Sequence, residues 1–277
     1  MNSEATAGAQ TFALTLLVIT HNEAANIAAC LDSVPFAAEK IVVDSGSTDA
    51  TAAIAAAHGA RVVYQPWLGF GAQRNFATTV ASNDWILVLD ADERLSPELA
   101  RELQQRLPQI LASGLAGALL RRTAWFMGAP MRWYRPLARE YIERLYHRGR
   151  ARWTDVRVHE ALHLRGASIR LSAPLLHRYT PTLAHRTVKD VSYAELKIED
   201  WLERDRPPRL WEMPFIFGLT FLKDYFLRLG FMDGWRGFAA AHLAAVYASY
   251  KRLRYYEITV NPDSQRVAAA LLQRLRP

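Results

Sequence analysis

Residues 85–93 read WILVLDADE, an uninterrupted apolar run that ends in three carboxylates. Because apolar and polar residues do not alternate, the run predicts a strand buried on both faces, as in a parallel sheet. Asp90 and Asp92 lie two residues apart, so in extended backbone their side chains point to the same side. Such carboxylates suit Mg²⁺ or Mn²⁺, which bind oxygen and keep positions open for substrate phosphates. The stretch therefore predicts a strand with a metal site at its carboxyl end.

The alternative is that the two aspartates only end the strand and cap the next helix, since so short a motif often occurs by chance. Two earlier apolar runs favour a site. Residues 14–20 end at residues 21–23 (HNE), and residues 40–43 end at Asp44. Helical periodicity between these runs predicts alternating strands and helices in a doubly wound sheet. Ligands of such sheets bind beyond the carboxyl ends of the strands, where all three polar clusters are expected.

The composition indicates a folded protein with a local excess of positive charge. The chain has 277 residues, 51% of them hydrophobic, which is enough for a sizeable core. Cys30 is the only cysteine, which excludes a disulfide framework and a thiolate metal site. Residues 121–178 hold 13 arginines and no lysine against four acidic residues. This basic segment suits a nucleic acid, an anionic membrane or a sugar nucleotide, unless it is simply a solvated face.

Common nucleotide-binding and membrane-spanning patterns are absent from the sequence. Residues 69–71 (GFG) lack the third glycine of a dinucleotide fingerprint, and no GxxxxGK[ST] motif exists. No uninterrupted apolar run reaches the roughly 20 residues of a membrane span. Residues 1–10 lack the basic region of a signal peptide, so a cytoplasmic location is expected.

The C-terminal third has helical periodicity. The sequence therefore predicts an α/β domain at residues 11–185 and a helical C-terminal extension at residues 186–277. The apolar stretch at residues 215–256 is interrupted by basic residues, among them Lys251, Arg252 and Arg254. This composition is typical of helices that lie in a membrane interface, and the alternative is that the apolar stripes pack on the rest of the protein.

Four stretches in this order and spacing carry a family resemblance: LTLLVITHNEAANIAACLDSV, IVVDSGSTDAT, GFGAQRNFA and WILVLDADE. Together they resemble the family 2 glycosyltransferases of GT-A fold, an α/β fold with a doubly wound, mostly parallel sheet. Further stretches (VHEALHLRG, LLHRY, GFMDGWRGFAAA) resemble the bacterial group that adds glucose to the lipopolysaccharide inner core. The resemblance covers residues 14 to about 256. It implies inverting, metal-dependent transfer of a sugar, with glucose expected, from a nucleotide sugar to a lipopolysaccharide core or another lipid-linked glycan.

The resemblance also implies roles for individual residues. Donor binding is expected from His21, Asn22, Glu23, Asp44, Arg74, Asn75 and Asp90. Mg²⁺ or Mn²⁺ is expected on Asp92 and Asp90. Glu160 corresponds to the acid on the acceptor side, where a general base typically contributes ~10²–10⁴-fold. The alternative for Glu160 is an ion pair with one of the many arginines, and Asp155 is the next candidate base. His177 is expected in the core or in an ion pair.

Two other functions remain open at the level of sequence. One is transfer to a polyprenyl phosphate, and the other is nucleic-acid binding by the basic segment. The second is disfavoured, because acids at strand ends would repel nucleic-acid phosphates unless a metal intervened. The expected partners are thus a nucleotide-sugar donor, a lipid-linked or core-oligosaccharide acceptor and an anionic membrane surface, with no nucleic acid. The expected location is peripheral, at the cytoplasmic face of the cell membrane.

Overall fold

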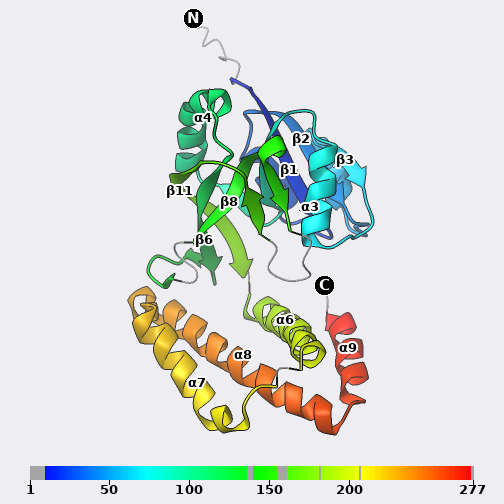
Figure 1. Ribbon diagram of the computed structural model, residues 1–277, viewed down its shortest axis with the longest axis vertical. Helices are drawn as coiled ribbons and strands as arrows, with labels where there is room; N and C mark the ends of the chain where they lie inside the picture. Colours follow the sequence, from blue (N-terminus) through cyan, green and yellow to red (C-terminus); the bar gives the residue numbers. More distant parts are fainter. Residues whose placement is uncertain (1–9, 136–139, 155–160, 181, 206, 276–277) are drawn as a thin grey trace, which may run out of the picture. The chain divides into compact units, whose positions relative to one another are not determined.

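The structure is a computed structural model that describes residues 10–135, 140–154, 161–180, 182–205 and 207–275 (Figure 1). Its contacts divide the chain into two compact units. Unit 1 comprises residues 1–123 and 140–177, and unit 2 comprises residues 124–139 and 178–277. The domain boundary expected at residue 185 stays a prediction, because compactness does not test whether either part folds alone.

A nine-stranded sheet forms the centre of unit 1 and continues into the first residues of unit 2. Its strands follow the order β3-β2-β1-β4-β8-β6-β11-β5, with β7 paired to β6. The strand bounds are β1 (Phe12–Thr20), β2 (Ala37–Asp44), β3 (Arg61–Tyr64), β4 (Trp85–Asp90), β5 (Glu93–Leu95), β6 (Gly117–Phe126), β7 (Ala129–Pro130), β8 (Glu140–His147) and β11 (Ser168–Thr180). The short strands β9 (Ala151–Trp153) and β10 (Leu162–Leu164) form a separate antiparallel pair. The helices are α1 (Ile27–Asp32), α2 (Thr51–Ala57), α3 (Phe70–Thr79) and α4 (Pro97–Ala112).

The sheet is mixed. Strands β3, β2, β1 and β4 run parallel, as the alternation of strand and helix predicts. Beyond β4, strand β8 pairs antiparallel with both β4 and β6, and β11 pairs antiparallel with β5. The α/β class and the helical C-terminal region are therefore confirmed, and the parallel arrangement is confined to one half of the sheet.

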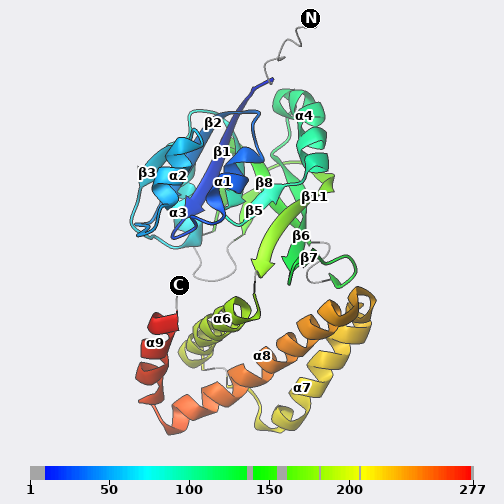
Figure 2. The ribbon, with the colours of Figure 1, turned by 180° about the vertical axis from the view of Figure 1, so that it is seen from behind.

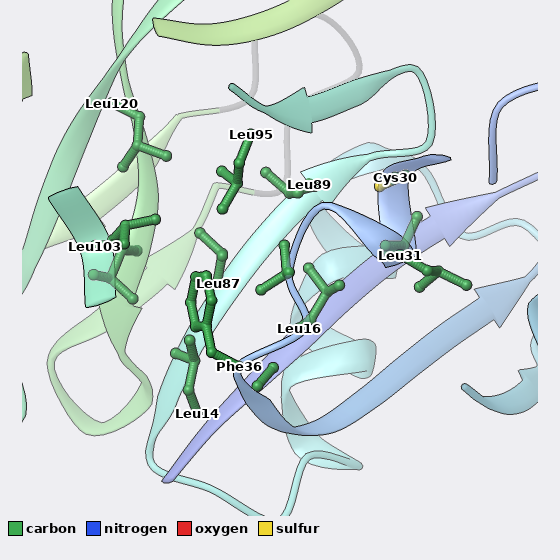
Figure 3. Close-up of a cluster of buried hydrophobic side chains, with 14 of the residues drawn as sticks. Leu14, Leu16, Cys30, Leu31, Phe36, Leu87, Leu89, Leu95, Leu103 and Leu120 are labelled. Carbon is green, nitrogen blue, oxygen red and sulfur yellow. The ribbon is translucent and has the colours of Figure 1, made fainter. Parts of the chain in front are cut away.

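The parallel strands are buried on both faces, which explains their unbroken apolar runs. On β4, Leu87 and Leu89 pack in one core cluster, whereas Ile86 and Val88 pack in another on the opposite face. Helix α3 covers one face (Figure 1), and α1 and α2 cover the other (Figure 2). Figure 3 shows Leu87 and neighbouring leucines in the larger cluster. Burying each leucine contributes roughly 1.5–3 kcal/mol, so these strands form a rigid base for the residues at their ends.

Unit 2 is mostly helical. Its helices are α6 (Leu183–Glu203), α7 (Met213–Leu222), α8 (Gly234–Val260) and α9 (Ser264–Leu275), and a π-helical turn (Lys223–Leu227) and a 3₁₀ turn (Gly230–Asp233) connect α7 to α8. Helices α6 and α8 share a small core of Ile198, Tyr255 and Ile258. Within the described residues, none of the helices has the length and apolar character needed to cross a membrane.

Two glycines allow the connection between α7 and α8 to turn sharply. A Cβ atom on Gly237 would lie 1.7 Å from the carbonyl oxygen of Gly230, and one on Gly230 would lie 2.9 Å from the carbonyl oxygen of Asp224. Gly234 has a positive φ of 60°, which side chains disfavour. The GFMDGWRG sequence is therefore a tight helical corner in which residues 230 and 237 have to lack side chains.

Candidate active site

The carboxyl ends of β1 and β2 are joined by hydrogen bonds between the loops that follow them. The Oδ1 atom of Asn22 accepts from the backbone N–H of Thr48 at 2.8 Å, and the N–H of Asn22 donates to the Ser47 hydroxyl at 2.8 Å. The N–H of Glu23 donates to the Thr51 hydroxyl at 2.8 Å. Asn22 has a positive φ of 55°, which asparagine tolerates better than most residues. The loops after β1 and β2 are thus bonded to each other at the carboxyl ends of these strands.

Asp44 closes the second of these loops. Its side chain is buried, and Oδ2 accepts from the N–H groups of Gly46 and Ser47 at 3.0 and 2.9 Å. Asp44 is the neighbour of Thr20 in the β1–β2 pair, beside the exposed His21. The clusters expected at the ends of β1 and β2 therefore lie together. A contact of Asp44, His21 or Glu23 with a nucleotide stays a prediction.

Asp90, at the end of β4, lies between two arginines. Arg74 Nη2 is 2.6 Å from Oδ1, and Arg144 Nη2 is 2.7 Å from Oδ2. Removal from water alone would raise the pKa of Asp90, but the charges of Arg144 and Arg74 outweigh this effect and hold the pKa well below its usual range. Asp90 is therefore ionised, and both of its oxygens are engaged within the protein.

Glu93 anchors the turn between β4 and β5. Its side chain is fully buried, and Arg144 donates to it twice, from Nη2 at 2.7 Å and from Nε at 2.9 Å. The backbone N–H of Asp90 also donates to Glu93, at 3.2 Å. Burial alone would lower the pKa of Arg144, but the charges of Asp90 and Glu93 raise it. We call residues 90–93 the DADE turn. Arg144, on β8, thus binds the acidic side chains at both ends of this turn.

Arg74 and Asn75 on α3 connect this turn to β9. The guanidinium carbon of Arg74 lies 4.7 Å from the centroid of the Trp153 ring, within cation–π range. The Asn75 side chain donates to the Trp153 carbonyl at 3.0 Å and accepts from its N–H at 3.1 Å. Asn75 therefore holds a neighbouring strand in place, and its expected contact with a donor stays a prediction.

Asp92 differs from Asp90 in its surroundings. Its side chain is 22% exposed, and its described polar contact is His177 on β11, whose Nε2 lies 3.1 Å from Oδ2. His177, expected in the core or in an ion pair, is buried and lies within hydrogen-bonding distance of Asp92. Among the residues that the structure describes, no group of three or more histidine, cysteine or acidic side chains could hold a metal. Asp92 and His177 could supply two metal ligands, which fits a cation whose other ligands are water and substrate phosphates.

Cys30 lies beneath this turn on α1. Its Sγ atom is 3.6 Å from the Asp90 carbonyl oxygen, within the range for a sulfur hydrogen bond. Burial, reinforced by the negative charges of Glu93 and Asp90, raises the pKa of the thiol well above its usual value. Cys30 is therefore a buried, protonated thiol that supports the backbone of the DADE turn.

Glu160 and Asp155 lie outside the described residues, so the assignment of a general base stays a prediction. The residues on either side of this segment pair with each other. The N–H of Thr154 donates to the Ala161 carbonyl at 2.9 Å, next to the pairing of Trp153 with Leu162. The flanking residues therefore meet beside Trp153, the ring that packs against Arg74.

Sequence reasoning missed Arg144 and the buried position of Glu93. Arginine is rarely buried, and Arg144 lies in a strand that also contains Glu140 and Glu143, so nothing local distinguishes it from a surface residue. Its partners are 51 and 54 residues away in the sequence. The third acid of the DADE stretch was visible, but its role depends on that distant arginine.

The sequence of this chain is similar to those of known proteins. The family model described as "Glycosyl transferase family 2" matches residues 15–162, which include the DADE turn and its partners Arg74 and Arg144. The chain is 30% identical over 253 residues to a "Lipopolysaccharide core biosynthesis glycosyltransferase LpsC" from Rhizobium meliloti, covering 88% of this chain and 92% of that protein. It is 29% identical over 251 residues to an uncharacterised glycosyltransferase, RP128, from Rickettsia prowazekii, covering 87% and 85% respectively.

Solved structures share less with this chain. One is glucosyl-3-phosphoglycerate synthase from Mycobacterium tuberculosis in complex with Mn²⁺, UDP and glucosyl-3-phosphoglycerate. It is 20% identical, covers 62% of this chain and 73% of its own, and has a TM-score of 0.41.

Proposed function

Because this chain belongs to glycosyl transferase family 2 and is related to lipopolysaccharide core biosynthesis, we propose that it transfers a sugar from a nucleotide sugar to a lipopolysaccharide core. Glucose is the sugar we propose, with inversion at its anomeric carbon. The observation that carries the proposal is the arrangement around the DADE turn. A partly exposed acid, Asp92, lies in the same turn as Asp90, which is held by two arginines at the carboxyl end of β4.

We propose that Asp92 holds Mg²⁺ or Mn²⁺, with His177 as a second ligand when its Nε2 is unprotonated. Such a cation would neutralise the charge that develops on the departing nucleoside diphosphate. Asp90 is less suited to the cation, because Arg74 and Arg144 engage both of its oxygens. In this proposal Asp90 holds the buried Arg74 in place at the carboxyl end of β4.

On the acceptor side, inverting transfer needs a base that takes the proton of the attacking hydroxyl. We propose Glu160 for this role, which the family resemblance suggests. Asp44 and residues 21–23 are proposed to hold the base of the nucleotide at the ends of β1 and β2. The acceptor is proposed to be lipid-linked, so that the enzyme works at the cytoplasmic face of the membrane.

The experiment presents purified protein with a panel of nucleotide sugars, with and without Mn²⁺ or Mg²⁺. Donor binding is followed by thermal shift, and transfer is followed on core oligosaccharides of truncated lipopolysaccharide and on polyprenyl phosphate. We expect one donor to stabilise the protein only with the cation, and transfer to core oligosaccharide. Transfer to polyprenyl phosphate alone would contradict the proposed acceptor. Full activity in the presence of a chelator would contradict the proposed metal dependence.

Asp92→Ala tests the metal assignment directly. A bound Lewis acid supplies several kcal/mol, so we expect transfer to fall by about 10²-fold or more. The melting temperature should change little, since Asp92 is not part of the buried Arg144 pair. Asp84→Ala removes an exposed acid that pairs with Arg148 and is the matched control. Wild-type rates for Asp92→Ala at saturating donor and Mn²⁺ would contradict the assignment.

A further inference from the structure

The connection between α7 and α8 exposes an unusual number of large apolar side chains. We define the hairpin tip as residues 222–238 together with residues 131–135, which pack on them. The exposed apolar residues of residues 222–238 are Leu222, Phe226, Leu227, Phe231, Met232, Trp235 and Phe238. Leu227 alone is 73% exposed. A patch of this kind marks a surface that binds a partner or a membrane.

Internal hydrogen bonds and an ion pair fix the backbone of the hairpin tip. Asp233 accepts hydrogen bonds from the backbone N–H groups of Arg132, Trp133 and Tyr134, at 2.7 to 3.0 Å. The Tyr134 hydroxyl donates to the buried Asp224 at 2.9 Å, and Arg228 pairs with the same carboxylate at 2.9 Å. Together with the contact between Gly230 and Gly237, these bonds fix the corner. The rings of Phe226, Phe231 and Phe238 also pack against Tyr225, so the corner presents them as one exposed aromatic cluster.

In the hairpin tip, the acidic side chains are engaged internally, whereas three of the basic side chains are exposed. Both of its acids, Asp224 and Asp233, are engaged by the internal bonds described above. Arg132, Arg135 and Lys223 are exposed, and within the described part of the chain none of the three pairs with a carboxylate. The outer surface of the hairpin tip is therefore apolar and positively charged.

Three other cations of unit 2 are turned inward. Arg252 pairs with Glu212 at 2.9 Å, and the buried Arg254 pairs with Glu195 at 2.9 Å. Lys251 lies 4.1 Å from the centroid of the Tyr247 ring, and burial together with the charge of Arg252 lowers its pKa to about 8. The sequence predicted these residues as membrane contacts, but in the structure they are engaged within unit 2.

We propose that the hairpin tip inserts into the interface of an anionic membrane. Phe, Trp and Leu interleaved with Arg and Lys are the composition of segments that bury apolar side chains below the headgroups and place cations among them. A second copy of this chain fits less well, because pairing two such surfaces would bring their cations together without acids to match. The inference rests on the proposed function for its purpose, which is access to a lipid-linked acceptor.

The test is flotation of the full chain with vesicles, a measurement independent of catalysis. We expect binding to vesicles of phosphatidylglycerol with phosphatidylcholine, and little binding to phosphatidylcholine alone. Replacing Arg132, Arg135 and Lys223 by Gln should weaken binding on the order of 100-fold, since each cation contributes roughly fivefold. Leu227→Glu with Phe231→Glu should abolish it. All five of these side chains are exposed, so circular dichroism should show intact folds.

Leu253→Glu with Val260→Glu is the matched control, because these residues are 60% and 82% exposed on α8 outside the hairpin tip. This pair should bind vesicles like the wild type. Equal loss of binding in the control, or no flotation of the wild type at low salt, would overturn the proposal. So would light scattering that shows a dimer which Leu227→Glu dissociates. Flotation without transfer activity would contradict the proposed function instead, and the two failures remain distinguishable.

Discussion

At the scale of single residues, the site depends on one arginine with two acids. Arg144 donates to Asp90 and twice to Glu93, and these bonds span the turn that presents Asp92. A buried ion pair adds little over an apolar pair of the same shape, but removal of one partner leaves an uncompensated charge. Arg144 therefore positions the turn, and its loss should be felt first in stability.

We expect Arg144→Met to cost about 3–5 kcal/mol of unfolding free energy, because Glu93 would stay buried with only the longer 3.6 Å contact to Arg122. Adding Glu93→Gln should recover part of this loss, which a double-mutant cycle in urea would measure. Arg148→Met is the control. Arg148 follows the same strand but pairs with the exposed Asp84, so its loss should cost no more than about 1 kcal/mol. Equal losses for both arginines would contradict this account.

Asp90 should make the unfolding free energy depend on pH in the acidic range. Its pKa is lowered in the folded protein, whereas an unfolded aspartate titrates near pH ~3.9. The stability that ionised Asp90 confers is thus fully present above that pH and is lost as the pH falls towards the folded pKa. The difference in unfolding free energy between wild type and Asp90→Asn should be constant above about pH 5 and shrink below about pH 4. A difference that grows in acid would refute the ionised state.

At the scale of elements, the corner between α7 and α8 is decided by small residues. Gly237 faces the Gly230 carbonyl with no room for a methyl group, whereas a Cβ on Gly218 in α7 would have nothing within 4 Å. Both glycines lie in helices, where glycine costs roughly 1 kcal/mol relative to alanine. Replacing each glycine by alanine therefore distinguishes the gain in helix propensity, expected at both positions, from the steric clash, expected only at Gly237.

Gly237→Ala should destabilise the protein and weaken vesicle binding, because the corner must open to admit the methyl group. Gly218→Ala should be neutral or stabilising by up to about 1 kcal/mol. Thermal unfolding and flotation of the two variants check this. Stability that rises in both would show that the helices separate easily and that the corner is not rigid.

The parallel half of the sheet could be predicted from the sequence, whereas the pairing of the strands in the antiparallel half could not. Runs such as residues 85–89 are apolar without alternation, because helices cover both faces of β4. Strand β8, in contrast, is read as EYIERLYH, whose order in the sheet depends on partners in β4 and β6 far away in the sequence. The site shows the same division. Its acids stand at strand ends where local patterns reveal them, whereas Arg144 is recognisable only once the strands are paired.

At the scale of the whole molecule, the two units are interleaved along the chain. Residues 124–135 belong to unit 2, where Phe126, Met131 and Tyr134 pack with Ala240 of α8. An insertion between β6 and β8 of the catalytic sheet thus needs the C-terminal helices to bury its apolar residues. Unit 1 consists of two segments of the chain, so a single truncation cannot isolate it.

A chain that ends at residue 177 should aggregate, because Phe126, Met131 and Tyr134 would lose their cover. The matched control also replaces residues 123–139 by an Asn-Gly turn. Arg122 and Glu140 are register partners in the β6–β8 pair, so a hairpin can close there. Solubility and binding of a hydrophobic dye compare the two. A soluble chain ending at residue 177 that binds no dye would show that the insertion is stable alone.

The buried Cys30 gives this chain a practical property. It is the only cysteine, its thiol is shielded from solvent, and its raised pKa keeps it protonated at neutral pH. Maleimide reagents need an accessible thiolate, so the native protein should resist alkylation. A cysteine introduced at Leu227 would then be the one reactive thiol, and an environment-sensitive fluorophore attached there could report how deeply that residue enters a bilayer, without prior removal of any native residue.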